Sequence, residues 1–246
     1  MRPLIRIAGL SVHLDFTWIA AFALISWSLT GGAGPRLTPH PSIGGDWRHA
    51  MTILALLFVS VLLHEVFQAL VAHQNGAGVR GIRLHPIGGE PELDREPPAP
   101  GADFLIGAIG PLMSFVLAAL AYGLGQLMRD APGVVVLTGY LFAINLLIGL
   151  VNLVPAPPLD GGRMLRAMLW WWSGRRAWAT RWALRAGLAF AAVLLVIGLV
   201  RLVRGEVIGG LWFALVALVL YRAGRSGAVV PTRPARVRRD VAARAA

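Results

Sequence analysis

LLHEVFQALVAH, residues 62–73, places a histidine and a glutamate side by side inside an apolar stretch. The segment around it, residues 51–71, is long enough to cross a bilayer as a helix, which takes about 20 apolar residues. Ionisable side chains are costly inside a membrane, so those found there usually serve a function. The stretch therefore predicts a membrane-spanning helix, with His64 and Glu65 as candidate functional residues.

The composition of the whole chain also predicts a membrane protein. Of the 246 residues, 57% are hydrophobic and only 14% are charged, too few to cover a water-soluble surface. Cysteine is absent, which excludes disulfides, a cysteine nucleophile and cysteine ligands to a metal. Lysine is absent too, so arginine carries the basic charge. The use of arginine in place of lysine, together with the high alanine and glycine content, is typical of a protein from a GC-rich prokaryotic genome.

Six apolar segments are candidate membrane-spanning helices. They cover approximately residues 15–30, 51–71, 104–128, 134–154, 182–203 and 207–221. We expect an all-α membrane protein with these spans in one domain, residues 1–224, and a basic cytoplasmic tail, residues 225–246. The chain starts with strand-like alternation and shows no signal-peptide cleavage pattern, so we expect the first span to be retained.

The arginines predict the orientation in the membrane, because cytoplasmic loops accumulate them. The densest clusters lie near Arg175 and in the C-terminal tail, and six spans place both on one side together with the N-terminus. We expect a multi-pass protein of a prokaryotic cell membrane with both termini in the cytoplasm. The net charge of +11 is then explained by topology, and the expected partner is the lipid bilayer rather than nucleic acid.

A polar segment separates the second and third spans: GVRGIRLHPIGGEPELDREPPAPG, residues 78–101. The partial alternation of Ile82, Leu84 and Ile87 and a turn at Gly88-Gly89 predict a β-hairpin or small sheet. A strand with a free edge could pair with an extended peptide.

The polar residues of the second span are spaced almost as in a zinc site. His64 and Gln68 are four residues apart and share a helix face, with Glu65 alongside. The pattern His-Glu-x-x-His supplies two zinc ligands and a base, but Gln68 occupies the place of the second histidine. An amide oxygen is a poorer zinc ligand than an imidazole or a carboxylate. The other interpretation is a polar pair hydrogen-bonded across the bundle.

A second motif lies in NLVPAPPLDGGRMLRAML, residues 152–169, where an apolar span ends in a proline-broken stretch. Taken alone, Asp160 could simply be the N-cap of a helix that begins near Arg163. Taken with His64-Glu65, the chain resembles the site-2 protease family of intramembrane zinc metalloproteases. That family carries His-Glu-x-x-His on one helix and Asn-x-x-Pro-x-x-x-Leu-Asp-Gly on another. The second motif is matched at Asn152, Pro155, Leu159, Asp160 and Gly161.

The resemblance covers most of the chain and implies a role for particular residues. It implies that His64 and Asp160 bind zinc, with Gln68 as a degenerate ligand position. It also implies that Glu65 is the general base that activates a water, and that Asn152 positions the substrate or stabilises the oxyanion.

Two further segments resemble family elements. Residues 81–93, with Gly88 and Gly89, resemble the strand that clamps the substrate, and Gly110-Pro111 with Ser114 resembles the Gly-Pro-x-x-Asn/Ser element. We expect neither a PDZ insertion nor a C-terminal regulatory domain.

These observations predict an intramembrane zinc metalloprotease that cleaves a transmembrane protein, with activity impaired by Gln68. An inactive homologue that binds transmembrane segments without cutting them is the alternative. A small transporter is a third possibility, but a transport site has no need of the second motif. Gln68 itself is compatible with a natural inactive homologue, an active enzyme with an unusual ligand, or an engineered substitution.

Overall fold

The structure is a computed structural model that describes residues 5–7, 10–14, 47–85, 88–93 and 95–227. Most of this part is helical: α2 (Trp47–Gln74), α3 (Pro100–Leu127), α4 (Pro132–Asn152), α5 (Asp160–Ser173), α6 (Arg176–Val203) and α7 (Val207–Gly227). Prolines at the first positions of α3 and α4 begin those helices, because the amide proton that proline lacks has no partner there. Gly174, with a left-handed φ of 64°, ends α5.

Four helices, α2, α3, α4 and α6, are long and apolar enough to cross a membrane. They confirm four of the six predicted spans. The first predicted span, residues 15–30, lies outside the described residues. The last is a helix, α7, but its apolar part, Val207–Arg222, is shorter than the other four. The tail from residue 228 onward is likewise outside the described residues.

A small sheet flanks the helices, as the sequence predicted for the segment between the second and third spans. It consists of β1 (Ile5–Ile7), β2 (Leu10–Leu14), β3 (Val79–His85) and β4 (Gly88–Leu93), hydrogen-bonded in the order β1-β2-β3-β4. The pair β2 and β3 is parallel, and the other two pairs are antiparallel. The predicted turn at Gly88-Gly89 is wrong: these glycines begin β4, opposite His85 and Leu84.

The sheet packs against α2 through a buried apolar cluster. Val12, Ile82 and Leu84 of the sheet meet residues of α2 that include Val61 and Ala69. The alternating side chains of β3 provide this contact, since every second residue of a strand faces the same way. The cluster fixes the sheet beside the helix that carries His64.

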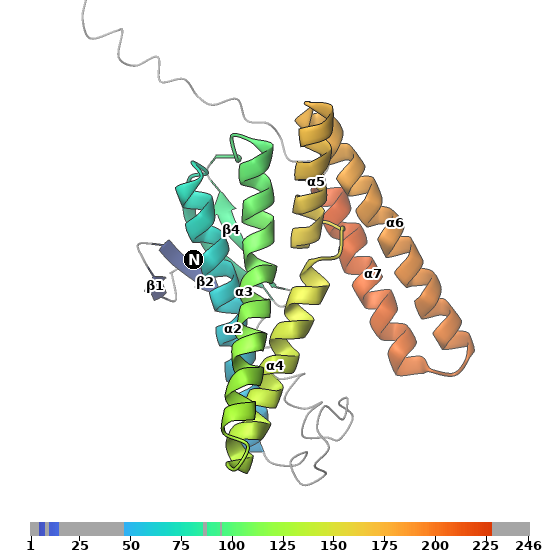
Figure 1. Cartoon of the computed structure of the whole chain (residues 1–246). Helices are drawn as coiled ribbons and strands as arrows, with labels where there is room; N and C mark the ends of the chain where they lie inside the picture. The colour runs from blue at the N-terminus through green and yellow to red at the C-terminus, as the bar shows by residue number, and fades with distance from the viewer. Residues whose placement is uncertain (1–4, 8–9, 15–46, 86–87, 94, 228–246) are drawn as a thin grey trace, which may run out of the picture.

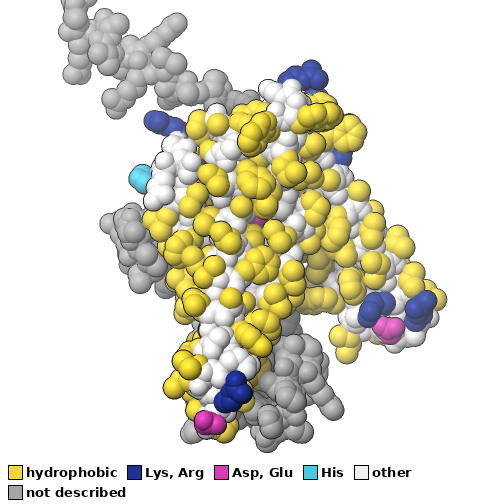
Figure 2. Space-filling view, viewed as in Figure 1, with side chains coloured by type: hydrophobic (Ala, Val, Ile, Leu, Met, Phe, Trp, Pro, Cys, Tyr) yellow, Lys and Arg dark blue, Asp and Glu magenta, His cyan; other side chains and the backbone are white. Residues whose placement is uncertain are grey.

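Helix α3 is the centre of the helical arrangement. It packs against α2, α4 and α5, whereas α6 and α7 pair with each other and α6 packs on α5 (Figure 1). Hydrophobic side chains cover most of the face shown in Figure 2, and charged side chains gather toward its ends. Large apolar residues such as Leu120 and Leu127 are exposed. A surface of this kind fits lipid rather than water, and the chain is a membrane protein.

A break separates α4 from α5 (Figure 1). Residues 153–159 form it and contain three prolines. The first turn of α5 then sits directly on this segment: a β-carbon at Gly161 would overlap the carbonyl oxygens of Leu153 and Val154. A β-carbon at Gly162 would overlap the backbone nitrogen of Pro157. The two glycines after Asp160 are therefore required by close packing of backbone against backbone.

Candidate metal centre

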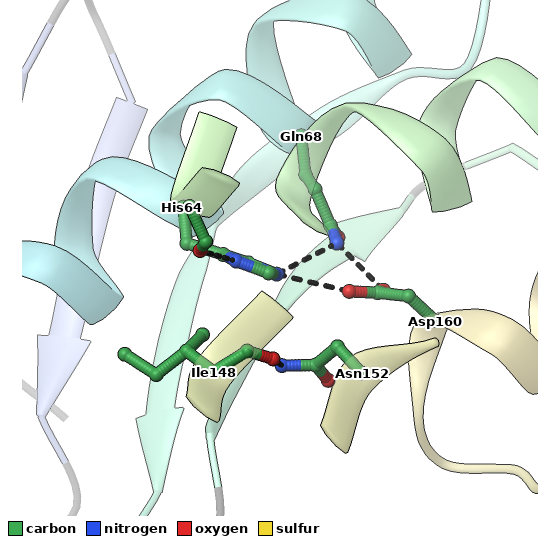
Figure 3. A network of polar contacts seen from close by, with 6 residues as sticks. His64, Gln68, Ile148, Asn152 and Asp160 are labelled. Atoms are coloured by element: carbon green, nitrogen blue, oxygen red, sulfur yellow. Dashed lines mark hydrogen bonds and ion pairs between the residues drawn. The ribbon is translucent and has the colours of Figure 1, made fainter. Parts of the chain in front are cut away.

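His64, Gln68 and Asp160 converge, although Asp160 lies 96 residues after His64 (Figure 3). His64 Nε2 is 2.9 Å from Asp160 Oδ2, and Gln68 Nε2 donates to Asp160 Oδ1 at 2.6 Å. The two nitrogens, His64 Nε2 and Gln68 Nε2, are 3.4 Å apart. His64 and Gln68 are each only 2% exposed. Helix α2 supplies the first two side chains from one face, and the first residue of α5 supplies the third.

Ser114 of α3 orients the His64 ring. Its hydroxyl oxygen is 2.9 Å from His64 Nδ1 and is fully buried. With Nε2 protonated and donating to Asp160, Nδ1 can accept from the Ser114 hydroxyl. When Nε2 instead binds a metal, Nδ1–H can donate to the same hydroxyl, because a hydroxyl both donates and accepts. Ser114 therefore suits His64 as a metal ligand.

The side chain of Asp160 does not cap a helix. Helix α5 begins at Asp160 itself, with Leu159 as N-cap residue and no side-chain capping hydrogen bond. The carboxylate points instead toward His64 and Gln68 (Figure 3). The capping interpretation and the helix start near Arg163 are both wrong, and the convergence expected of a metal site is present.

Gly110 of α3 forms the back of the centre. A β-carbon at this position would overlap His64 Nε2 and would lie 2.6 Å from Gln68 Nε2. Only glycine lets α3 approach both side chains this closely. The sequence placed Gly110 in a family element but did not show this contact.

Gly110→Ala should therefore displace His64 and Gln68 and lower the free energy of unfolding. Overpacking of this kind costs about 1–3 kcal/mol. Gly123→Ala is the matched control on the same helix, because nothing lies within 4 Å of its β-carbon position. That control should be neutral or stabilising by up to about 1 kcal/mol. Thermal unfolding in detergent measures both. Equal stability of the two variants would contradict the close packing at Gly110.

The donor groups fit a zinc ion in part. An imidazole nitrogen and a carboxylate oxygen are usual zinc ligands, and ligands about 2.0–2.2 Å from a tetrahedral ion lie roughly 3.3–3.6 Å from one another. Only the 3.4 Å between His64 Nε2 and Gln68 Nε2 is of this size. The contacts of 2.9 and 2.6 Å to Asp160 are hydrogen bonds and must lengthen to admit an ion. Gln68 can turn its amide so that the carbonyl oxygen faces the ion. Among the described residues no group of three or more His, Cys, Asp or Glu side chains could hold a metal, so the third ligand position has only this amide.

The other predicted site residues have different surroundings. Glu65 is buried beside His64, with 4% of its surface exposed. Asn152 ends α4, and its side-chain amide donates to the carbonyl oxygen of Ile148 at 3.0 Å (Figure 3). Gly88 and Gly89 lie in β4, an edge strand of the sheet as described. The roles predicted for these residues stay predictions.

A buried ion pair beside the centre was not predicted. Asp103 of α3 is fully buried and binds Arg166 of α5 through both carboxylate oxygens, at 2.6 and 2.9 Å. An acidic residue near the start of an apolar segment was the signal that could have directed attention to it.

Comparisons with known proteins point to one family. Residues 125–194 match the family model described as Peptidase family M50. The solved structure of the site-2 protease from Methanocaldococcus jannaschii superposes with a TM-score of 0.66 and 29% sequence identity, over 93% of this chain and 95% of that one. This chain is a homologue of the site-2 proteases. The family resemblance inferred from the two motifs is confirmed.

Curated relatives of this site-2 protease homologue have names consistent with that assignment. Rip3 of Mycobacterium tuberculosis, named as a zinc metalloprotease, is 34% identical over 226 residues, which is 91% of this chain and 57% of Rip3. A zinc metalloprotease of Methanocaldococcus jannaschii is 36% identical over 152 residues, or 61% of this chain and 43% of that protein. The homologue thus spans about half the length of the curated relatives it matches.

Proposed function

We propose that this chain is an intramembrane metalloprotease of the site-2 type that cleaves transmembrane proteins, and that Gln68 lowers its zinc affinity and its turnover. The observation that carries the proposal is the meeting of His64, Gln68 and Asp160 from two helices in a buried centre. The zinc metalloprotease names of the relatives support the choice of metal.

In this proposal each residue has a definite task. His64 and Asp160 hold the ion, and the amide of Gln68 is a weak third ligand. Zinc, when bound, supplies Lewis acidity, which makes water available as a nucleophile near neutral pH and polarises the scissile carbonyl. Glu65 takes a proton from the attacking water and passes it to the leaving amine. Asn152 holds the substrate or donates to the developing oxyanion.

The substrate would be a transmembrane segment in extended form. A helix hides its amides in internal hydrogen bonds, so it must unwind before a carbonyl can be attacked. Strand β4 lies at an edge of the described sheet, where an extended peptide can pair with it. We propose Gly88 and Gly89 as contacts of the bound peptide, because glycine lets another backbone approach closely.

The inactive homologue is the second candidate, and one observation favours it. Gln68 donates to Asp160, and His64 contacts Asp160 directly, so the three side chains satisfy one another. Replacement of this network by an ion must break those hydrogen bonds. In this candidate the chain binds transmembrane segments at the sheet edge and does not cut them.

The two candidates differ in a direct assay of the purified protein. The wild-type chain and Glu65→Gln are reconstituted in liposomes with a model transmembrane substrate, and bound zinc is measured by elemental analysis. The protease proposal expects slow cleavage and substoichiometric zinc, with cleavage lost in Glu65→Gln because the water loses its base. Substrate binding without zinc or cleavage would favour the inactive homologue.

We also propose that both termini and the sheet lie on the cytoplasmic side of a prokaryotic cell membrane. Arg95 precedes α3 and Arg129 follows it, so these exposed residues mark opposite ends of one membrane-crossing helix. Since the chain has no cysteine, Arg95→Cys and Arg129→Cys can be labelled without background. An impermeant thiol reagent added to intact cells should label Cys at 129 and not at 95. The reverse pattern would overturn the orientation.

A further inference from the structure

One face of α3 carries four buried residues in a row: Asp103, Gly107, Gly110 and Ser114. Their spacing of four, three and four residues aligns them along the helix. Gly110 and Ser114 contact the side chains of the metal centre, as described above. Asp103 and Gly107 contact α5, the helix that begins with Asp160. Helix α3 is thus the common support on which the two halves of the centre are aligned.

The contact between Asp103 and α5 is strong and directional. Arg166 Nε donates to Asp103 Oδ2 at 2.9 Å, and Arg166 Nη2 donates to Oδ1 at 2.6 Å. Arg163 Nε is 4.0 Å from Oδ1. A guanidinium that binds both oxygens of a carboxylate fixes orientation as well as distance. Asp103 is 0% exposed and the Arg166 side chain is 24% exposed, so the pair is screened less than an ion pair at the surface.

The next contact along α3 reaches Asp160 itself. A β-carbon at Gly107 would lie 3.1 Å from the carbonyl oxygen of Asp160 and 3.1 Å from Met164 Cγ. Asp160 precedes Arg166 by six residues, a distance of about 9 Å along a helix. The position of Arg166 along the axis of α3 therefore sets the position at which Asp160 faces His64.

We propose that Asp103 is a positioning residue, which holds α5 through Arg166 at the height where the Asp160 carboxylate meets His64 and Gln68. A displacement of α5 by one residue would move Asp160 by about 1.5 Å, enough to break the contacts of 2.9 and 2.6 Å. Asp103 itself touches neither a ligand side chain nor the substrate in this scheme. The proposal rests on the proposed function only in taking His64 and Asp160 as the metal ligands.

The test measures the position of α5 without relying on catalysis. Leu127 near the end of α3 and Met168 on α5 are exposed, by 82% and 58%, and can be changed to cysteine for spin labels. Because they lie far apart along the helix axes, their distance reports sliding of α5 along α3. The distance between the labels is measured by pulsed electron paramagnetic resonance, and zinc affinity is measured in the Gln68→His background. Both are compared among the protein with Asp103 and Arg166 unchanged, Asp103→Asn and Arg166→Lys.

Asn145→Val serves as the matched control. Asn145 of α4 is 0% exposed and donates to Ser60 of α2 at 2.9 Å, so this variant breaks a buried polar contact away from α5. Arg166→Lys keeps the positive charge but loses the pair of donors that binds both carboxylate oxygens. It therefore separates positioning by the two hydrogen bonds from compensation of the Asp103 charge. It also provides the test if Asp103→Asn does not fold.

We expect Asp103→Asn and Arg166→Lys to shift the label distance by about 1.5 Å or to broaden it, and to weaken zinc binding by about 10- to 100-fold. Asn145→Val should change neither. A label distance in Arg166→Lys and Asp103→Asn that equals the control would overturn the positioning role. A shifted distance with no zinc bound in any variant would support positioning and count against the metal centre.

Discussion

Gln68→His is expected to raise zinc affinity at least tenfold, the largest gain of function that a single substitution offers in this chain. The new imidazole would share a face of α2 with His64 and would replace the weakest donor of the set. Loss of an outer-shell partner alone changes metal affinity by about 10- to 100-fold, and a ligand should matter more. Glycine at position 110 provides room beside this side chain. Elemental analysis and competition with a chelator measure the effect.

Cleavage of a transmembrane substrate should increase in the same variant. Glu65→Gln in the Gln68→His background should remove the gain while zinc stays bound, because the base is lost and the ligands are not. Gln74→His is the control. Gln74 is exposed on the same helix, so this substitution adds a histidine away from the centre. An equal increase in zinc for both histidine variants would mean that Gln68 is not at a ligand position.

Among the described glycines, Gly161 is the one whose replacement by alanine is expected to cost the most stability. Its β-carbon would overlap the backbone carbonyls of Leu153 and Val154, and backbone atoms cannot move aside as a flexible side chain can. The start of α5 must shift, and Asp160 with it. We expect a loss of about 3 kcal/mol or more in the free energy of unfolding and a loss of zinc affinity in the Gln68→His background of about 10- to 100-fold.

Gly133→Ala tests whether this effect is local. Gly133 is the second residue of α4 as Gly161 is of α5, but nothing lies within 4 Å of its β-carbon position. Both substitutions add the same methyl group at the same helical position. If thermal unfolding shifts equally in the two variants, the contact of Gly161 with the broken segment is not what makes glycine necessary.

The sequence predicted the components of the centre better than their arrangement. His64 and Asp160 were identified because polar groups in apolar segments are rare and the second motif has fixed spacing. Four of the spans followed from length and hydrophobicity. The parallel pairing of β2 with β3 was beyond reach, since the short strands β2 (Leu10–Leu14) and β3 (Val79–His85) lie far apart in the chain and carry no mark of their partners. Asp103 and Arg166, 63 residues apart, meet only because two helices pack.

Glycine positions show the same difference. Gly88 and Gly89 were predicted as a turn on composition, but glycine is also used where backbones approach, and here the pair begins a strand. Gly110 and Gly161 were identified from motifs, yet the reason for each is a neighbouring atom that no pattern within one segment reveals.

The three prolines between α4 and α5 have a consequence for hydrogen bonding in a medium without water. Irregular backbone inside a membrane leaves amide protons that find no acceptor, and each costs several kcal/mol. Pro155, Pro157 and Pro158 have no amide proton. Within the break, the amides of Val154, Ala156 and Leu159 donate to carbonyl oxygens of Val151, Val154 and Ala156. The amide groups of the break therefore need no water as hydrogen-bond acceptor. The polar groups near the centre that can bind an ion or a substrate are then side chains and not unpaired backbone amides.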